Sequence, residues 1–114
     1  MKNIPCEFVQ EIVNTFGVNN QLEKTVEECA ELIKALIKYK HGAGKYIDVI
    51  DELADVKILM KQMILLFGKE EVDKRVAYKV MRLKKRITQY DPSGNREDIL
   101  ERILEDRSNG KKMV

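Results

Sequence analysis

Apolar residues recur at steps of three and four along most of this chain, and that spacing limits the fold more than any other feature. One run consists of Leu22, Val26, Cys29, Ile33 and Leu36, and the next of Val49, Leu53, Val56, Met60, Met63 and Phe67. Such steps keep one face of an α-helix apolar, and no stretch shows the sustained alternation that is typical of a β-strand. The sequence therefore predicts an all-α protein.

Glycine and proline divide the chain into five predicted helices, which we assign to one domain over residues 1–109, with 110–114 as a disordered tail. The predicted helices cover 3–16, a segment from Asn20 to the KHGAGK turn, 46–67, 69–89 and 96–106. The run ILMKQMILLF in the third helix is apolar nearly all round, so neighbours must cover several of its sides.

A chain of 114 residues has few other helices to cover that run. We therefore expect an antiparallel helical bundle of about five helices, with a four-helix-bundle-like core that oligomerisation completes. A homodimer or a homotetramer would provide the missing cover. A monomer with the third helix at its centre is the alternative.

The composition also narrows the choice of partner and compartment. Although 35% of the residues are charged, the net charge is only +2, so nucleic acid is not favoured overall. No N-terminal signal pattern or membrane-spanning apolar run occurs, and we expect a cytoplasmic protein without membrane contact. Cys6 and Cys29 lack the spacing of a CxxC motif, and we interpret them as reduced thiols that act as small apolar residues.

Two acidic pairs flank the apolar faces of the second and third helices. Glu28 and Glu31 are three residues apart, as are Glu52 and Asp55, so each pair shares one helix face. At about 1.5 Å per residue, Glu31 and Glu52 lie roughly 14 and 9 Å from the connecting turn, and Glu28 and Asp55 roughly 18 and 14 Å. If the two helices pack antiparallel, the four carboxylates come level within about one helical turn.

Four carboxylates at one level repel one another, and a divalent cation would offset that repulsion. All-oxygen ligands without His or Cys select hard ions such as Mg²⁺ or Mn²⁺. A di-iron site needs a Glu-x-x-His motif, but the single histidine, His41, falls in a predicted turn. The sequence thus favours a Mg²⁺ site, and an ordinary solvated acidic face is the alternative.

These residues resemble the MazG-like family of all-α nucleoside triphosphate pyrophosphohydrolases, in its single-module form, over residues 21–86. The likeness is carried by Glu27-Glu28-x-x-Glu31, a spacer of about twenty residues, Glu52-x-x-Asp55, and Gln21 and Lys24 in the lead-in segment QLEKTVEECAEL. Family members of this size are usually dimers or tetramers whose sites are completed across subunits.

The resemblance implies a Mg²⁺-dependent enzyme, with Mn²⁺ as a substitute ion, that serves nucleotide-pool house-cleaning. It would cleave a nucleoside triphosphate between the α- and β-phosphates, giving a monophosphate and pyrophosphate. The implied metal ligands are Glu28, Glu31, Glu52 and Asp55. A metal-bound water would attack in line, and Glu27 or Glu28 would accept its proton.

Substrate ligands are expected ahead of the first acidic motif and on the fourth helix. The resemblance places Gln21 and Lys24 in the first group. Lys79, Arg82 and Arg86 share one face of the fourth helix, and forked guanidinium groups suit phosphate oxygens. The alternative for this basic face is a solubilising role, or pairing with the acids of a neighbouring subunit.

Two further functions stay open. A helical-bundle adaptor or regulator could retain the acidic scaffold without turnover, and metal binding without hydrolysis would indicate it. A nucleic-acid binder could use the basic fourth helix. However, the chain has no helix-turn-helix signature and no alternation of basic and aromatic residues.

Overall fold

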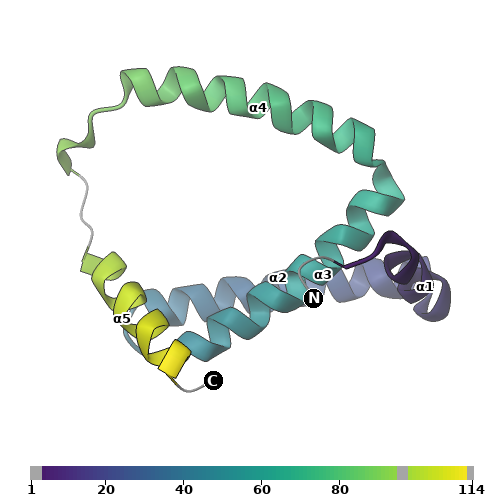
Figure 1. Cartoon of the computed structure of the whole chain (residues 1–114), viewed down its shortest axis with the longest axis horizontal. Coiled ribbons are helices and arrows are strands. Elements are labelled where there is room, and N and C mark those ends of the chain that lie inside the picture. Colours follow the sequence, from purple (N-terminus) through teal and green to yellow (C-terminus); the bar gives the residue numbers. More distant parts are fainter. Residues whose placement is uncertain (1–3, 95–97, 113–114) are drawn as a thin grey trace.

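The computed structural model of the protein describes residues 4–94 and 98–112, and this part of the chain is all-α, as predicted. Its helices are α1 (Cys6–Phe16), α2 (Val18–Lys40), α3 (Tyr46–Phe67), α4 (Lys69–Gln89) and α5 (Asp98–Lys112), with a 3₁₀ turn, η1 (Pro92–Gly94), before α5. Figure 1 shows α2 and α3 side by side as a hairpin, with α1 near one end and α5 near the other.

Two glycines end helices without an intervening loop. Gly17 and Gly68 have φ angles of +93° and +119°, a conformation that residues with a Cβ atom rarely adopt. The backbone N–H of Gln21 donates to the carbonyl of Gly17 at 3.0 Å, so a new helix starts directly after the glycine. For this reason α2 begins at Val18, two residues before the predicted start at Asn20.

The first helix starts later than predicted. α1 begins at Cys6, where the N–H groups of Phe8 and Val9 each donate to the carbonyl of Pro5 at 3.1 Å. Pro5 is the N-cap residue, and the N–H that proline lacks is not needed by the helix at this place. The predicted start at residue 3 lies outside the described residues.

The last helix is longer than predicted. α5 continues to Lys112, beyond the predicted end at 106 and into the segment 110–114 that the sequence analysis assigns to a disordered tail. Gly110 packs on the ring of Tyr46, where an added Cβ atom would lie 3.5 Å from Cε2. The Tyr39 hydroxyl also donates to Asp106, one helical turn earlier. These contacts with the hairpin hold the last turns of α5 in helical form, and the local sequence does not indicate that continuation. Residues 95–97 and 113–114 lie outside the described part.

The apolar core of one chain is small. In the described residues, the buried apolar side chains are those of Val9, Val13, Tyr39 and Leu59. Inside the hairpin a polar pair accompanies them, because the Gln21 side-chain amide donates to the Gln62 Oε1 atom at 2.7 Å. Gln62 is only 1% exposed, so this hydrogen bond joins α2 to α3 away from water.

Helix α4 stands apart from the hairpin. It continues from α3 at Gly68 and arches past the hairpin (Figure 1), and none of its residues is buried. The predicted need of α3 for cover is met only in part, since Leu59 is buried while Ile58 and Leu65 are each 38% exposed. Across residues 4–94 and 98–112, no helix has both the length and the apolar content needed to cross a membrane.

Candidate metal centre

The hairpin brings three of the four predicted metal ligands together. Carboxylate oxygens of Glu28 on α2, and of Glu52 and Asp55 on α3, all lie within 4.8 Å of one another. Glu52 and Asp55 are neighbours on one turn of α3, and the antiparallel course of α2 places Glu28 opposite them. Because Mg²⁺ binds oxygen at about 2.0–2.1 Å, oxygens around one ion are at most about 4.2 Å apart. A small rotation of the side chains would close the three around a single ion.

The environment of these acids is partly desolvated. Glu28 is only 9% exposed, and the buried Oε2 atom of Glu52 has no hydrogen-bond partner among the described residues. A buried oxygen without a partner is costly, and either a proton or a cation would compensate it. The donor set is all oxygen, which is the chemistry that Mg²⁺ and Mn²⁺ prefer. The three acids therefore fit a hard divalent cation.

The two central glutamates respond to this environment in opposite ways. Burial raises the pKa of Glu52, and the neighbouring negative charges of Glu28, Asp55 and Glu31 act in the same direction. In contrast, the hydrogen bond from Lys24 lowers the pKa of Glu28, since the ammonium favours the ionised carboxylate. The Lys24 Nζ atom lies 3.1 Å from a Glu28 oxygen. Opposed shifts in adjacent acids are a feature of functional sites, although structural ion pairs produce them too.

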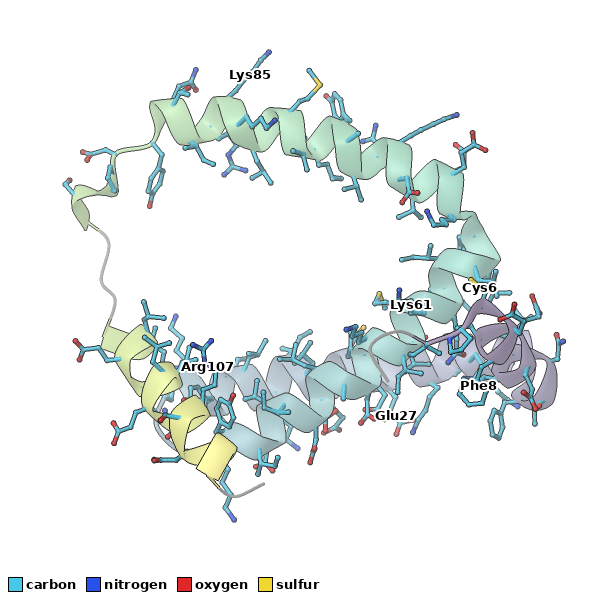
Figure 2. The ribbon with its side chains drawn as sticks, viewed as in Figure 1. Cys6, Phe8, Glu27, Lys61, Lys85 and Arg107 are labelled. Atoms are coloured by element: carbon cyan, nitrogen blue, oxygen red, sulfur yellow. The ribbon has the colours of Figure 1, made fainter. Side chains whose placement is uncertain are left out.

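The remaining acids of the first motif lie outside this group. Glu31 is not one of the three clustered acids; it lines a cavity beside them, together with Glu52. Glu27 is exposed on the side of the hairpin turned away from α4 (Figure 2), with its carboxylate 3.7 Å from the Lys24 ammonium. Lys24, predicted as a substrate ligand, thus pairs with two acids of its own helix.

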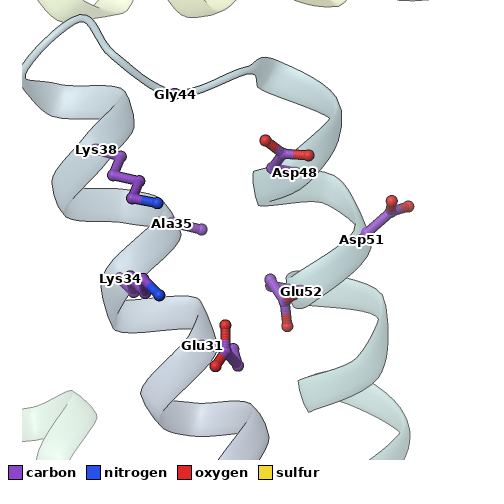
Figure 3. Close-up of a pocket in the computed structure, with 8 residues that line it drawn as sticks. All are labelled: Glu31, Lys34, Ala35, Lys38, Gly44, Asp48, Asp51 and Glu52. Atoms are coloured by element: carbon purple, nitrogen blue, oxygen red, sulfur yellow. The ribbon is translucent and has the colours of Figure 1, made fainter.

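The cavity beside the cluster has a volume of about 200 Å³ and extends between α2 and α3 toward their connecting turn. Figure 3 shows Lys34 and Lys38 extending from α2 toward α3, which contributes Asp48, Asp51 and Glu52. In the described part of the chain, neither lysine lies within 4.0 Å of a carboxylate. The two ammonium groups therefore stay available to an anion.

Lys34 and Lys38 are not among the residues predicted from the sequence, although a signal for them exists. They follow Glu31 by three and seven residues, which places all three on one side of the helix. Gly44 closes the cavity at the turn and has no room for a side chain, because an added Cβ atom would lie 3.0 Å from the Tyr39 backbone nitrogen.

The other predicted substrate ligands are not at the cluster within one chain. Gln21 is buried inside the hairpin, where its amide is bound to Gln62. Lys79, Arg82 and Arg86 lie on α4 and line a separate cavity of about 200 Å³. Because α4 stands apart from the hairpin (Figure 1), these three cations do not meet the carboxylates of the hairpin in their own chain.

We find no match to the chain among models of protein families, among curated proteins or among solved structures. The likeness to MazG-like proteins therefore rests on the residues of the two acidic motifs and their lead-in segment. What the fold and the site define by themselves is an all-α hairpin protein with a cluster of three carboxylates suited to a hard cation.

Proposed function

We propose that the protein is a Mg²⁺-dependent nucleoside triphosphate pyrophosphohydrolase of the MazG-like type, which releases a nucleoside monophosphate and pyrophosphate. The observation that supports this most is the group formed by Glu28, Glu52 and Asp55, whose oxygens lie within 4.8 Å of one another. The buried and unpartnered Oε2 atom of Glu52 adds a reason for a cation to bind there. The compartment that we propose for this activity is the cytoplasm.

Glu28, Glu52 and Asp55 would hold the ion, and Glu31, at the edge of the adjacent cavity, would join them when substrate is bound. When bound, Mg²⁺ supplies charge neutralisation at the phosphate oxygens and a water of lowered pKa. Both Glu27 and Glu28 pair with Lys24, and Glu28 also belongs to the acid cluster. One of these two carboxylates would accept the water proton.

The cavity between α2 and α3 would receive the phosphates. A polyphosphate that approaches several carboxylates needs cations besides the metal, because the like charges repel. Lys34 and Lys38 supply two such groups within the same chain, and both line the cavity that Glu31 and Glu52 border. Ammonium groups are common phosphate ligands.

We also propose that the protein acts as a homodimer or homotetramer. Lys79, Arg82 and Arg86 are exposed on α4, away from the acids of their own chain. In an assembly, they would be free to serve the site of another copy. Lys79, Arg82 and Arg86 would then keep the role in substrate binding that the sequence predicts.

Product analysis tests the proposed reaction. The purified full chain, with Mg²⁺ or Mn²⁺, is incubated with ribo-, deoxyribo- and modified nucleoside triphosphates, and the products are separated by ion-exchange chromatography. We expect a monophosphate and pyrophosphate from at least one substrate, and loss of both products with chelator or in Glu28→Gln and Asp55→Asn. Glu11→Gln, a change at an exposed acid of α1, serves as the matched control and should keep full activity.

Each other result has a defined meaning. Release of orthophosphate would contradict the proposed cleavage between the α- and β-phosphates. Failure to hydrolyse any substrate of the panel would contradict the enzymatic proposal. If Mn²⁺ still bound under those conditions, the alternative of a helical-bundle adaptor or regulator with an acidic scaffold would take its place.

A further inference from the structure

Helix α5 is attached to the hairpin at the turn that joins α2 to α3. Its Arg102 side chain binds both ends of that turn, because the guanidinium donates to the backbone carbonyl of Tyr39 on α2 and to that of Gly44 just before α3. The hydrogen bond to Gly44 is 3.0 Å long. A planar fork of N–H donors is suited to binding two acceptors at once. Arg102 therefore ties the end of α2 to the residue that leads into α3.

Arg102 is itself held by an aromatic and an acidic neighbour. Its guanidinium lies over the Tyr39 ring, 3.8 Å from the ring centroid, which is a cation–π contact. The Tyr39 hydroxyl donates to Oδ2 of Asp106, and Nε of Arg102 lies 3.8 Å from the same oxygen. Tyr39 is buried, and the side chains of Arg102 and Asp106 are only 32% and 30% exposed. These contacts give the guanidinium one orientation toward the turn.

Lys38 lies between the two residues that Arg102 binds. It directly precedes Tyr39, and its backbone carbonyl accepts the N–H groups of Ala43 and Gly44 at 3.0 and 3.2 Å. Gly44 also packs at the base of the Lys38 side chain, since a Cβ atom added to Gly44 would lie 3.1 Å from the Lys38 Cβ atom. Arg102 thus holds the backbone on both sides of Lys38.

Lys34, the other lysine of the cavity, lacks this support. Both lysines line the cavity of about 200 Å³ and extend from α2 toward α3 (Figure 3). Lys34 lies one helical turn further from the connecting turn. Within the described residues, the backbone groups of the hairpin that Arg102 binds belong to Tyr39 and Gly44, neither of which adjoins Lys34. The two lysines therefore differ in their connection to α5.

We propose that Arg102 is a positioning residue for Lys38 and, through it, for the phosphate groups of a bound polyphosphate. By holding the carbonyls of Tyr39 and Gly44, it keeps the Lys38 ammonium directed across the cavity. Arg102 does not line the cavity, and so it acts through the turn. This inference rests on the proposed use of the cavity as a phosphate site. It adds a residue beyond 21–86, the part of the chain that carries the likeness to MazG-like proteins.

Positioning matters for a lysine because its side chain is long and flexible. Binding an anion costs such a side chain rotamer freedom, and a side chain that is already restricted loses less of it. Gly44 restricts Lys38 at its base, and Arg102 keeps Gly44 there. The effect of Arg102 should therefore appear in the affinity for the anion, and it should depend on Lys38.

The coupling of Arg102 to each lysine tests this proposal. Isothermal titration calorimetry gives the affinity of the full chain for inorganic tripolyphosphate with Mg²⁺. It is applied to Arg102→Gln, Lys38→Ala and Lys34→Ala, and to the double variants that combine Arg102→Gln with one lysine change. We expect Arg102→Gln to weaken binding about tenfold in the wild type, and to have little further effect once Lys38 is alanine. In the Lys34→Ala background its full effect should remain, because the two losses add.

Two further variants separate this role from general damage to α5. Arg107→Gln is the matched control, because Arg107 is exposed on the same helix (Figure 2), and it should leave the affinity unchanged. Arg102→Lys keeps the positive charge but lacks the fork that binds both carbonyls, so it should also weaken binding. Circular dichroism shows whether each variant keeps its helices. If Arg102→Gln loses helix, the same coupling is measured with Arg102→Lys.

Equal coupling of Arg102 to Lys38 and Lys34 would overturn the proposal, as would an unchanged affinity in both Arg102 variants. Failure of the wild type to bind tripolyphosphate would overturn it too, because Lys38 would then hold no anion. A wild type that binds tripolyphosphate but hydrolyses no nucleoside triphosphate is a different result. It would contradict the proposed function, while the measured coupling would still decide the role of Arg102.

Discussion

Carboxylate oxygens of Glu28 on α2 and Glu52 on α3 lie within 4.8 Å of each other, although both side chains are acids. Burial raises the pKa of Glu52, whereas the hydrogen bond with Lys24 lowers the pKa of Glu28, so the two acids respond to the site in opposite directions. A divalent cation between the two carboxyl groups would offset their repulsion. Several consequences for stability, metal binding and catalysis come from this pair.

The pair makes the stability of the metal-free protein depend on pH. The folded state holds the Glu52 proton more tightly than the unfolded state, because the folded pKa is raised above 4.5. The stabilising contribution is complete below pH 4.5 and declines as the pH rises through the folded pKa. We therefore expect Glu52→Gln to be more stable than the wild type at neutral pH in chelator, and the difference in Tm to shrink toward acid pH.

Thermal unfolding between neutral pH and pH 4.5, followed by circular dichroism, measures the difference in Tm between the wild type and Glu52→Gln. Comparison of the two proteins at each pH removes the contribution of the titrating groups that do not interact with Glu52. A difference in Tm that stayed constant with pH, or that grew toward acid pH, would show that Glu52 does not hold its proton in the folded state.

Metal binding should reverse the effect of these acids on stability. We predict that Mn²⁺ raises the Tm of the wild type, since a ligand at a hundred times its Kd stabilises a protein by about 2.7 kcal/mol. Asp55→Asn should lose most of this increase in Tm, because it removes one of the three clustered carboxylates. Glu11→Gln, at an exposed position of α1, should keep the full increase. Equal increases in all three proteins would place the ion elsewhere.

The hydrogen bond between Gln21 and Gln62 should contribute to the stability of the hairpin. Replacing Gln62 by leucine leaves the buried Gln21 amide without its partner, and we expect a loss of about 1–3 kcal/mol in the free energy of unfolding. The double variant Gln21→Leu with Gln62→Leu should recover most of that loss, since no unpaired polar group remains. Urea denaturation gives the three values, and a double variant no more stable than the single one would argue against this interpretation.

The two lysines of the cavity should affect substrate affinity more than turnover. Removing both ammonium groups in Lys34→Ala with Lys38→Ala should raise KM about tenfold to a hundredfold, as expected from the loss of hydrogen bonds to a charged group. The increase in Tm with Mn²⁺ should persist, because neither lysine is a metal ligand.

Lys40→Ala is the matched control for the lysines, since it removes an exposed ammonium from the end of the same helix. Steady-state kinetics with the best substrate of the panel gives KM and kcat for both variants. An unchanged KM in the double variant would mean that the phosphates bind outside this cavity.

Tyr39 is expected to ionise only at strongly alkaline pH. Burial, followed by its hydrogen bond to Asp106, raises the pKa of Tyr39 to about 12. Because the folded state keeps this proton, the stability that it contributes is present below pH 10 and declines between pH 10 and 12. Tyr39→Phe should remove the ionisation near pH 12 from a spectrophotometric titration. The same change should lower the free energy of unfolding by about 1 kcal/mol. If the variant kept an ionisation near pH 12, that ionisation would not belong to Tyr39.

The sequence predicts the helices well where glycine marks their ends. The observed bounds of α3, Tyr46–Phe67, and α4, Lys69–Gln89, are those predicted, because Gly68 separates the two without a loop. It predicts α5 poorly, since the contacts of that helix with Tyr39 and Tyr46 come from residues far away in the chain. Local patterns contain no signal for such distant support.

The sequence predicts which helical turns carry the candidate site. It does not predict which side chains meet there. Spacing along an antiparallel hairpin brings Glu28, Glu52 and Asp55 to one level, as expected. The rotation of each helix about its own axis decides which side chains meet, and residue spacing does not fix it. This is why Glu31 and Lys34 border a neighbouring cavity, which no single motif indicates.

Anomalous diffraction from crystals grown with Mn²⁺ and a non-hydrolysable triphosphate tests the central claim most directly. We expect a manganese peak between α2 and α3, bound to oxygens of Glu28, Glu52 and Asp55, with a phosphate oxygen on the same ion. A triphosphate held without manganese at these three carboxylates, or manganese bound only at other acids, would contradict the account.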